Sequence, residues 1–384
     1  MKKIRCAIIN SNYTKIGPFT KKGTEIFAYG LIQGLTKYNK KDVQVTSFCS
    51  GNSRLPGKTA SISYFSSIED KTIGNTYHAF FELSLISKAI SMQNDFDIFH
   101  INLGNGEYFL PFLRFVRKPV VITMHNPTTI DAFQKKMFPI YRERGFSNVF
   151  FVNISNYQKK GLPYLPYIRT IYHGIDTKKY FFNAIGGRQM IWTGRAIPEK
   201  GLDVVLQIAK KIKKQTKVFP IIKEEYIGWL QNEIINKRDT INQIVKINID
   251  FNVLRSNLAK EYQSSKLFLF PVKFDEPFGL TLVESLACGT PVVAYGRGSV
   301  PEILKDGETG FIVNPSDDDI RGNWIIKKTG IEGLCEAIER IYALPEAEYK
   351  QMRLNCRAHV EKNFTVERMI DQYVEVYKEI LAKK

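Results

Sequence analysis

The chain of 384 residues has no long apolar segment. It contains no run of about 18 consecutive apolar residues, which is the length that a helix needs to span a bilayer. The first residues, MKKIRCAIIN, pass straight into a short apolar strand and lack the long apolar core of a secretory signal. We therefore expect a cytoplasmic protein without a leader peptide.

Cysteine is scarce, with five residues, an odd number, and no C-x-x-C pair. A disulfide framework needs paired cysteines and a structural zinc site needs clustered ones, so both are disfavoured and a reducing compartment is indicated. The spacing of zinc fingers and the aromatic strings of RNA-recognition modules are also missing. We expect no nucleic acid as a partner.

Acidic residues are outnumbered in the first half of the chain. Through residue 182 there are 25 Lys and Arg against 11 Asp and Glu, whereas the remainder has 30 against 27. A basic surface attracts an anionic membrane, an acidic acceptor or nucleic acid, but it is equally compatible with a solvated face. Peripheral contact with the inner membrane face therefore stays open. The candidate contacts, on either side of Pro139, are Lys135, Lys136, Arg142 and Arg144.

Short apolar runs alternate with helix-length amphipathic stretches, which is the pattern of parallel βα units. The predicted strands are residues 4–10, 43–48, 97–102, 119–124 and 149–153, then 190–193, 218–222, 244–247, 267–272 and 291–295. Prolines and a glycine pair interrupt the pattern at 161–187, so the domain junction is predicted near Ala184. After Thr365, apolar residues recur at helical spacing.

The length exceeds what one core normally accommodates. We predict an α/β fold of two doubly wound, Rossmann-like domains, residues 1–183 and 184–364, that face a cleft. A terminal helix, residues 365–384, is expected to brace them.

The stretch 275–284, DEPFGLTLVE, looks like a ligand site. A proline and Gly279 mark the change from loop to helix, and glycine lets a ligand approach the backbone. The amides of Leu280 and Thr281 would share a helical face with Glu284. Amides at a helix start suit a phosphate, whereas the carboxylates of Glu276 and Glu284 suit sugar hydroxyls. A nucleotide sugar carries both groups. The alternative is an ordinary loop with solvated acids.

Further candidates follow other predicted strands. Arg195 and Lys200 come after strand 190–193 and can neutralise a diphosphate, unless they are solvated loop cations. Gly23, after the first strand, permits close backbone approach. His125 follows strand 119–124 and can bond a sugar hydroxyl, or it is a buried structural histidine.

A metal-binding D-x-D pattern occurs at Asp95 and Asp97. We discount it because Asp97 opens a predicted parallel strand, and ligands bind at the opposite, carboxyl end. With two cations and helix amides available for the diphosphate, we expect no metal and no cofactor.

The motifs together resemble the retaining GT-B glycosyltransferases of family 4, glycosyl transferases group 1. The resemblance lies in GR at 194–195, PEKG at 198–201 and EPFGL at 276–280 through Glu284. It continues through 284–294, 298–303 and 306–311, and shorter stretches at 155–158 and 172–176 are similar to the interdomain segments. It covers most of the chain and is strongest from 171 to 313.

The resemblance implies a role for each matching residue. Glu284 would bind the donor ribose, Glu276 and His125 would contact the transferred sugar, and Arg195 and Lys200 would hold the diphosphate. The other implied donor contacts are Phe278, Gly279, Leu280, Thr281 and Gly23. Two departures concern the phosphate loop, where many relatives have two glycines instead of Lys22-Gly23, and the base pocket, where residues 221–226 replace a glycine-rich turn.

The sequence thus predicts a metal-independent, retaining transfer of a hexose-like sugar from a nucleoside diphosphate sugar to an acceptor hydroxyl. Such a reaction would belong to polysaccharide, lipid-linked glycan or glycoconjugate biosynthesis of the bacterial type. The loops at 103–109 and 127–145 are expected to select the glycan, glycolipid or small-molecule acceptor. A sugar-nucleotide epimerase or phosphorylase on the same fold, and a basic protein that binds nucleic acid or membrane, remain alternatives.

Overall fold

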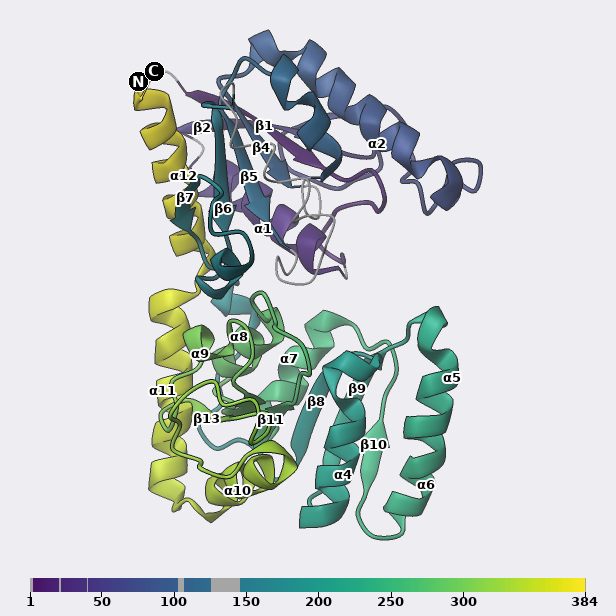
Figure 1. Cartoon of the computed structure of the whole chain (residues 1–384), viewed down its shortest axis with the longest axis vertical. Coiled ribbons are helices and arrows are strands. Elements are labelled where there is room, and N and C mark those ends of the chain that lie inside the picture. Colours follow the sequence, from purple (N-terminus) through teal and green to yellow (C-terminus); the bar gives the residue numbers. More distant parts are fainter. Residues whose placement is uncertain (1–2, 21, 40, 103–106, 126–145, 384) are drawn as a thin grey trace. The chain divides into compact units, whose positions relative to one another are not determined.

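The computed structural model describes residues 3–20, 22–39, 41–102, 107–125 and 146–383. It divides into two compact units (Figure 1). Unit 1 consists of Met1–Gly174 and Val366–Lys384, and unit 2 of Ile175–Thr365. Each unit is a parallel sheet covered by helices, so the predicted α/β fold of two Rossmann-like domains is confirmed.

Unit 1 is built on a seven-stranded parallel sheet of order β3-β2-β1-β4-β5-β6-β7. Its strands are β1 (Ile4–Asn10), β2 (Val43–Phe48), β3 (Lys58–Ala60), β4 (Ile98–Asn102), β5 (Val120–Met124), β6 (Val149–Asn153) and β7 (Tyr167–Thr170). The sequence missed β3 and β7. Both are short edge strands whose residues are partly exposed, so they carry no continuous apolar run.

The two faces of this sheet bury alternate residues, as a pleated strand requires. Ala7 and Ile9 of β1 pack in the cluster that includes α2 (Gly74–Ser91) and the 3-10 segment η2 (Glu107–Phe115). Cys6 and Ile8 pack on the other side with α1 (Gly23–Lys37) and α12 (Val366–Ala382). Both cores are therefore made from residues distant in sequence.

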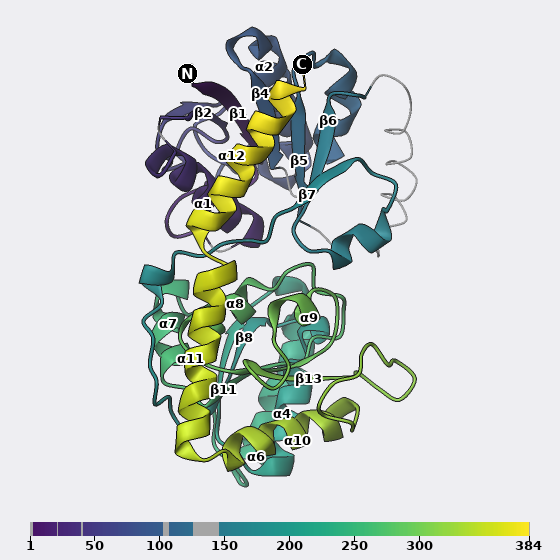
Figure 2. The same cartoon turned by 90° about the vertical axis from the view of Figure 1, so that its left-hand side faces the viewer.

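The terminal helix α12 is part of unit 1 and lies beside α1 (Figure 2). Its Tyr377 hydroxyl is 2.6 Å from His100 Nδ1, and its Tyr373 hydroxyl is 3.0 Å from Thr123 Oγ1. All four side chains are buried. These hydrogen bonds provide partners for the buried polar side chains of His100 in β4 and Thr123 in β5.

Unit 2 is built on a six-stranded parallel sheet of order β10-β9-β8-β11-β12-β13. Its strands are β8 (Met190–Arg195), β9 (Thr216–Ile221), β10 (Ile247–Ile249), β11 (Leu267–Phe270), β12 (Val292–Tyr295) and β13 (Gly310–Val313). Its main helices are α4 (Leu202–Ile212), α6 (Asn236–Asn242), α7 (Arg255–Gln263), α8 (Leu280–Ala287), α10 (Gly330–Ala343) and α11 (Glu346–Asn363).

Alternation again separates the two faces of the sheet. Trp192 and Leu269 pack in the core with α4 and α10. Phe268 points the other way, with its ring 5.5 Å from that of Tyr262 in α7. The strand predicted at 244–247 is wrong in its position: the amides of Ile244 and Val245 bond the Ile241 carbonyl in the turn after α6.

The structural division falls between residues 174 and 175, earlier than the junction predicted near Ala184. Residues 175–183 pack on unit 2 instead. The Ile175 amide donates to the Phe364 carbonyl at 2.9 Å, and the buried Arg353 guanidinium donates to the Asn183 carbonyl at 2.6 Å. Tertiary hydrogen bonds, which composition does not reveal, therefore set the boundary.

Two further observations concern the described residues alone. None of their helices combines the length and the apolar composition that crossing a membrane requires. All five cysteines are buried and free.

Candidate functional site

The predicted donor residues of unit 2 gather at the carboxyl edge of its sheet, where β8 and β11 are neighbours. Arg195 is the last residue of β8, and Lys200 ends the single 3-10 turn η6 (Pro198–Lys200). Gly201 follows with φ +70°, and a Cβ there would lie 2.1 Å from the Pro271 carbonyl oxygen. This close approach, which only glycine permits, sets Lys200 against the loop that follows β11.

Lys200 and Glu276 form an ion pair in that loop. The distance from Lys200 Nζ to Glu276 Oε2 is 2.5 Å, and only 15% and 12% of the two side chains are exposed. Lys200 Nζ also lies 4.6 Å from the centre of the Phe274 ring. The pair is thus largely shielded from water, which strengthens its attraction and fixes both side chains.

Arg195 differs from Lys200. Its side chain is exposed, and it makes no hydrogen bond or ion pair with any residue within the described ranges. Its guanidinium is available to a phosphate, which it can bind through two parallel hydrogen bonds.

The helix α8 begins as the sequence predicted. Gly279 caps it with φ +88°, and a Cβ there would meet Leu282 Cδ1 at 2.9 Å. Leu280 and Thr281 lie in the first turn, where backbone N–H groups have no partner within the helix. The predicted donor residue Phe278 is 2% exposed and its ring packs near Phe364, so its side chain anchors the loop and leaves only its backbone for a ligand.

Glu284 is buried on α8 and bound by an arginine that sequence reasoning missed. Arg255 Nε donates to Glu284 Oε1 at 2.6 Å, and Arg255 Nη2 donates to the same oxygen. Burial lowers the pKa of Arg255, but the charge of Glu284 outweighs it, so the net shift is upward. The Tyr180 phenol lies nearby, and its pKa is raised by burial and by Glu284. Arg255 starts another helix, so no local spacing could have linked it to Glu284.

His125 and Gly23 belong to unit 1. His125 follows β5, is 7% exposed, and bonds Asn102 Oδ1 through Nε2. Because an amide oxygen only accepts, Nε2 carries the proton and Nδ1 is left as an acceptor. No described residue bonds Nδ1. Burial lowers the pKa of His125 to about 3, so the ring is neutral at physiological pH.

Gly23 is the first residue of α1, and no atom lies within 4 Å of where its Cβ would be. Packing therefore does not require glycine at this position, but the open space leaves the backbone accessible. The acceptor loop predicted at 127–145, its four cations and most of the loop at 103–109 lie outside the described residues.

The discounted D-x-D pattern lies at the amino end of β4. Asp97 pairs with Arg5 of β1, with Arg5 Nη2 2.7 Å from Asp97 Oδ1 and the Arg5 amide 2.9 Å from Asp97 Oδ2. The carboxylate thus ties two strands together. Within the described ranges, no group of three or more His, Cys, Asp or Glu side chains is arranged to hold a metal ion.

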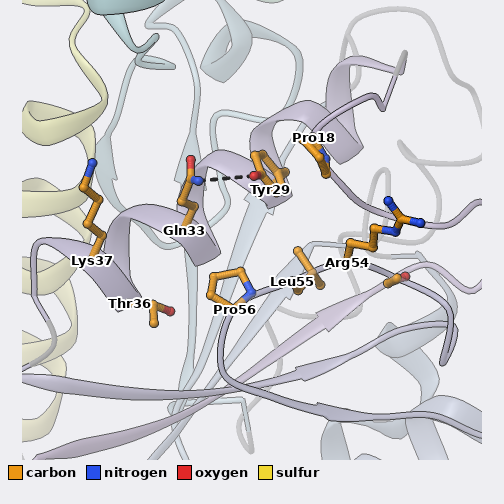
Figure 3. A pocket seen from close by; sticks show the side chains of 9 residues that line it. Pro18, Tyr29, Gln33, Thr36, Lys37, Arg54, Leu55 and Pro56 are labelled. Atoms are coloured by element: carbon orange, nitrogen blue, oxygen red, sulfur yellow. Dashed lines mark hydrogen bonds between the residues drawn. The ribbon is translucent and has the colours of Figure 1, made fainter.

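A depression of about 550 Å³ on unit 1 contains none of the predicted site residues. Tyr29, Gln33 and Lys37 of α1 line one side, and Arg54 and Leu55 of the loop after β2 the other (Figure 3). Lys37 and Arg54 lie at opposite ends, so the two cations do not converge on one ligand position.

Known proteins resemble this chain in sequence and in fold. Residues 181–328 match the family model described as glycosyl transferases group 1. A D-inositol 3-phosphate glycosyltransferase from Mycobacterium leprae is 32% identical over 130 residues, which are 34% of this chain and 30% of that protein. The chain therefore aligns with less than a third of that relative's length.

Solved structures match over the whole chain. Sucrose-phosphate synthase from Thermosynechococcus elongatus has a TM-score of 0.76 at 18% identity, covering 100% of both chains. HepE from Anabaena, solved with UDP and glucose, has a TM-score of 0.72 at 14% identity, covering 98% of this chain and 100% of HepE. At these identities the likeness shows the fold, which is that of GT-B glycosyltransferases.

Proposed function

We propose that this chain is a retaining glycosyltransferase that moves a hexose-like sugar from a nucleoside diphosphate sugar to an acceptor hydroxyl. The observation that carries the proposal is the shielded Lys200–Glu276 pair at the start of α8. A cation, free amides and a carboxylate there offer partners to a diphosphate and to sugar hydroxyls at once. The family match across 181–328, which contains these residues, supports it.

In this mechanism, the bond from the anomeric carbon to the diphosphate oxygen breaks, and the acceptor oxygen bonds that carbon on the same face. Lys200, Arg195 and the amides of Leu280 and Thr281 stabilise the negative charge that develops on the leaving diphosphate. The acceptor proton passes to the departing phosphate. No metal or cofactor is required by these steps.

The remaining contacts concern the donor. Glu276 orients the transferred sugar and Glu284, held by Arg255, accepts hydrogen bonds from the ribose hydroxyls. The resemblance assigns further donor contacts to His125 and Gly23. The neutral His125 ring offers Nδ1, the unbonded acceptor described above, to a hydrogen bond donated by a sugar hydroxyl.

The proposed partners are a nucleotide sugar and a glycan, glycolipid or small-molecule acceptor. Cytoplasmic location is part of the same proposal and rests on the five scattered cysteines. Peripheral contact with an anionic membrane is also part of it, because the first half carries 25 basic against 11 acidic residues.

The test starts from the wild-type protein and a panel of nucleoside diphosphates and their sugars. Since HepE was solved with UDP and glucose, UDP-glucose is the first donor to test. A bound donor raises the melting temperature by mass action. Release of the nucleoside diphosphate then measures turnover, with water or added sugars as acceptors.

Glu276→Gln and Lys200→Met should each lower turnover by about 100-fold or more, because Lys200 stabilises the developing charge and Glu276 positions the transferred sugar. Lys273→Met is the matched control, because Lys273 forms a comparable 2.7 Å pair with Asp203 but is 42% exposed. Undiminished turnover in Glu276→Gln or Lys200→Met would refute these roles.

The reaction products distinguish a glycosyltransferase from the alternative functions. A donor consumed without a new bond between sugar and acceptor would indicate an epimerase or phosphorylase. Binding to nucleic acid that falls steeply with salt, without turnover of any donor, would favour the basic binding protein.

A further inference from the structure

Four charged side chains next to Glu276 form a closed ring of contacts: Asp275, Arg297, Asp319 and Arg321. Asp275 Oδ1 accepts a hydrogen bond from the Gly298 amide at 3.1 Å and pairs with Arg321 Nη1. Arg321 Nε bonds Asp319 Oδ1 at 2.7 Å, and Asp319 Oδ2 bonds Arg297 Nη2 at 2.7 Å. Since Gly298 follows Arg297 in the chain, the circuit closes through the backbone.

The charges in this ring balance, with two arginines and two aspartates. The four side chains are between 19% and 30% exposed, so water and salt screen them less than an ordinary surface pair. Hydrogen bonds to Arg321, together with the charges of Arg321 and Arg297, lower the pKa of Asp319 despite the opposing effect of burial. Asp319 is therefore a charged partner at neutral pH.

The segment that carries Arg321 is fixed by a buried side chain. Asn314, the residue after β13, accepts the amides of Arg321 and Gly322 at 2.8 and 3.2 Å through Oδ1. Its Nδ2 donates to the Gly322 carbonyl at 2.9 Å. The backbone at Arg321 and Gly322 is thus tied to Asn314, in a position from which the guanidinium reaches Asp275.

On its other side, at Gly298, the ring packs closely against the backbone of Glu276. A Cβ on Gly298, whose φ is +61°, would lie 2.3 Å from the Glu276 carbonyl oxygen and 2.4 Å from its amide nitrogen. The Ser299 amide donates to the same carbonyl at 2.9 Å, and Ser299 Oγ donates to the Phe278 carbonyl at 2.8 Å. The loop after β12 therefore holds the backbone on both sides of the Glu276 carboxylate.

We propose that the ring of Asp275, Arg297, Asp319 and Arg321 is a positioning element that holds Glu276 against Lys200. This inference rests on the proposed function and adds to it residues that touch neither donor nor acceptor. The ring joins three loops at the carboxyl ends of β11, β12 and β13, so it fixes Glu276 more rigidly than the local chain can. Arg321 acts through Asp275, and its removal frees the loop without removing any ligand contact.

The variant Arg321→Met tests the proposal, with Arg321→Lys as its conservative partner. A positioned group that shifts by about 1 Å can cost about 100-fold in rate, so we expect kcat to fall by 10- to 100-fold in Arg321→Met. The KM for the donor should change by less than about threefold, because Arg195 and the helix amides still hold the diphosphate. Arg321→Lys should recover part of the loss, since lysine keeps the positive charge but lacks the planar guanidinium that bonds both Asp275 and Asp319.

Two controls distinguish positioning from a general effect on folding. Arg340→Met removes an exposed pair with Glu336 on α10 and should leave kcat unchanged. In a Glu276→Gln background, Arg321→Met should cause no further loss, because the ring acts only through Glu276. A full additional loss in that background would overturn the proposal.

A readout independent of turnover separates this inference from the proposed function. Crystal structures of the wild-type protein, Arg321→Met and Arg340→Met should show the Lys200–Glu276 contact intact in the first and third and broken in the second. If no donor is turned over but the contact breaks in Arg321→Met, the proposed function fails while the ring keeps its role. An intact contact in Arg321→Met overturns the ring's role, whatever the activity.

Discussion

Glu82 of α2 is a buried carboxyl group that the sequence did not single out. It is 1% exposed, and its Oε2 accepts the Asn12 amide at 2.8 Å and the Ser11 hydroxyl at 3.2 Å. His78 Nε2 lies 3.8 Å away. Burial raises the pKa of Glu82 to about 7, with a further upward effect from Glu25, although the two hydrogen bonds oppose the shift.

This shift makes the stability of unit 1 depend on pH. Between its unfolded pKa near 4.5 and about 7, Glu82 keeps its proton in the folded state and loses it in the unfolded state. Stability therefore falls as pH rises through this range, by roughly 3 kcal/mol in all. Glu82→Gln resembles the protonated form and should be more stable than wild type, with an advantage that grows by roughly 2 kcal/mol between pH 5.5 and 8.5.

Hydrogen exchange of buried amides in unit 1, compared between variant and wild type at each pH, measures this difference. The side chain of Glu375 is 64% exposed, so Glu375→Gln should show no comparable trend. An advantage of Glu82→Gln that is the same at both pH values would contradict the assigned cause.

At the scale of elements, the crossing of α1 and α12 depends on one glycine. A Cβ on Gly34 would lie 2.4 Å from Ile370 Cγ1, and Ile370 is fully buried. The two helices therefore approach closely only because position 34 has no side chain. Gly30, one turn earlier on α1, has no atom within 4 Å of its missing Cβ.

The two glycines should respond oppositely to alanine. Gly30→Ala should stabilise the protein by roughly 0.5 to 1 kcal/mol, because alanine favours the helix. Gly34→Ala gains the same propensity but overpacks the crossing, at a cost of about 1 to 3 kcal/mol, so we expect a net loss. Urea denaturation of both variants measures the contrast, and equal stabilisation would show that the crossing can widen freely.

The elements themselves were largely predictable. The strands β1, β2 and β6 have the predicted bounds because buried apolar residues mark each of them, as a run in β1 and β6 and at alternate positions early in β2. The strand β13 was missed, since it has only four residues and begins at the end of a segment whose glycines are typical of a turn, DGETG at 306–310. Gly310, at φ +137°, is instead required by the Val292 carbonyl, 1.9 Å from where its Cβ would be.

At the scale of the whole molecule, the chain leaves unit 1 after Gly174 and returns at Val366. Helix α12 supplies eight buried residues to unit 1, among them Ile370, Tyr373 and Tyr377, which are fully buried. Unit 1 therefore depends on residues that follow unit 2 directly in the sequence.

Removal of residues 366–384 should destabilise unit 1 and leave unit 2 intact. The deletion uncovers the apolar side of α1 and leaves the His100 and Thr123 side chains without their tyrosine partners. Limited proteolysis followed by mass spectrometry should find the first cleavages in unit 1. First cleavages in unit 2 would contradict this dependence, and removal of only 383–384 should have no effect.

The sequence by itself determined the class of fold and most of the candidate site, because both are written in local patterns. Apolar periodicity marks strands and helices, and Lys200, Glu276 and Glu284 each stand in a short motif whose turn chemistry fixes where the backbone goes. Only the tertiary structure decided which distant side chains support them. Arg255 and Arg321 reach their carboxylates from other elements, and contact between separate elements leaves no spacing in the sequence to find.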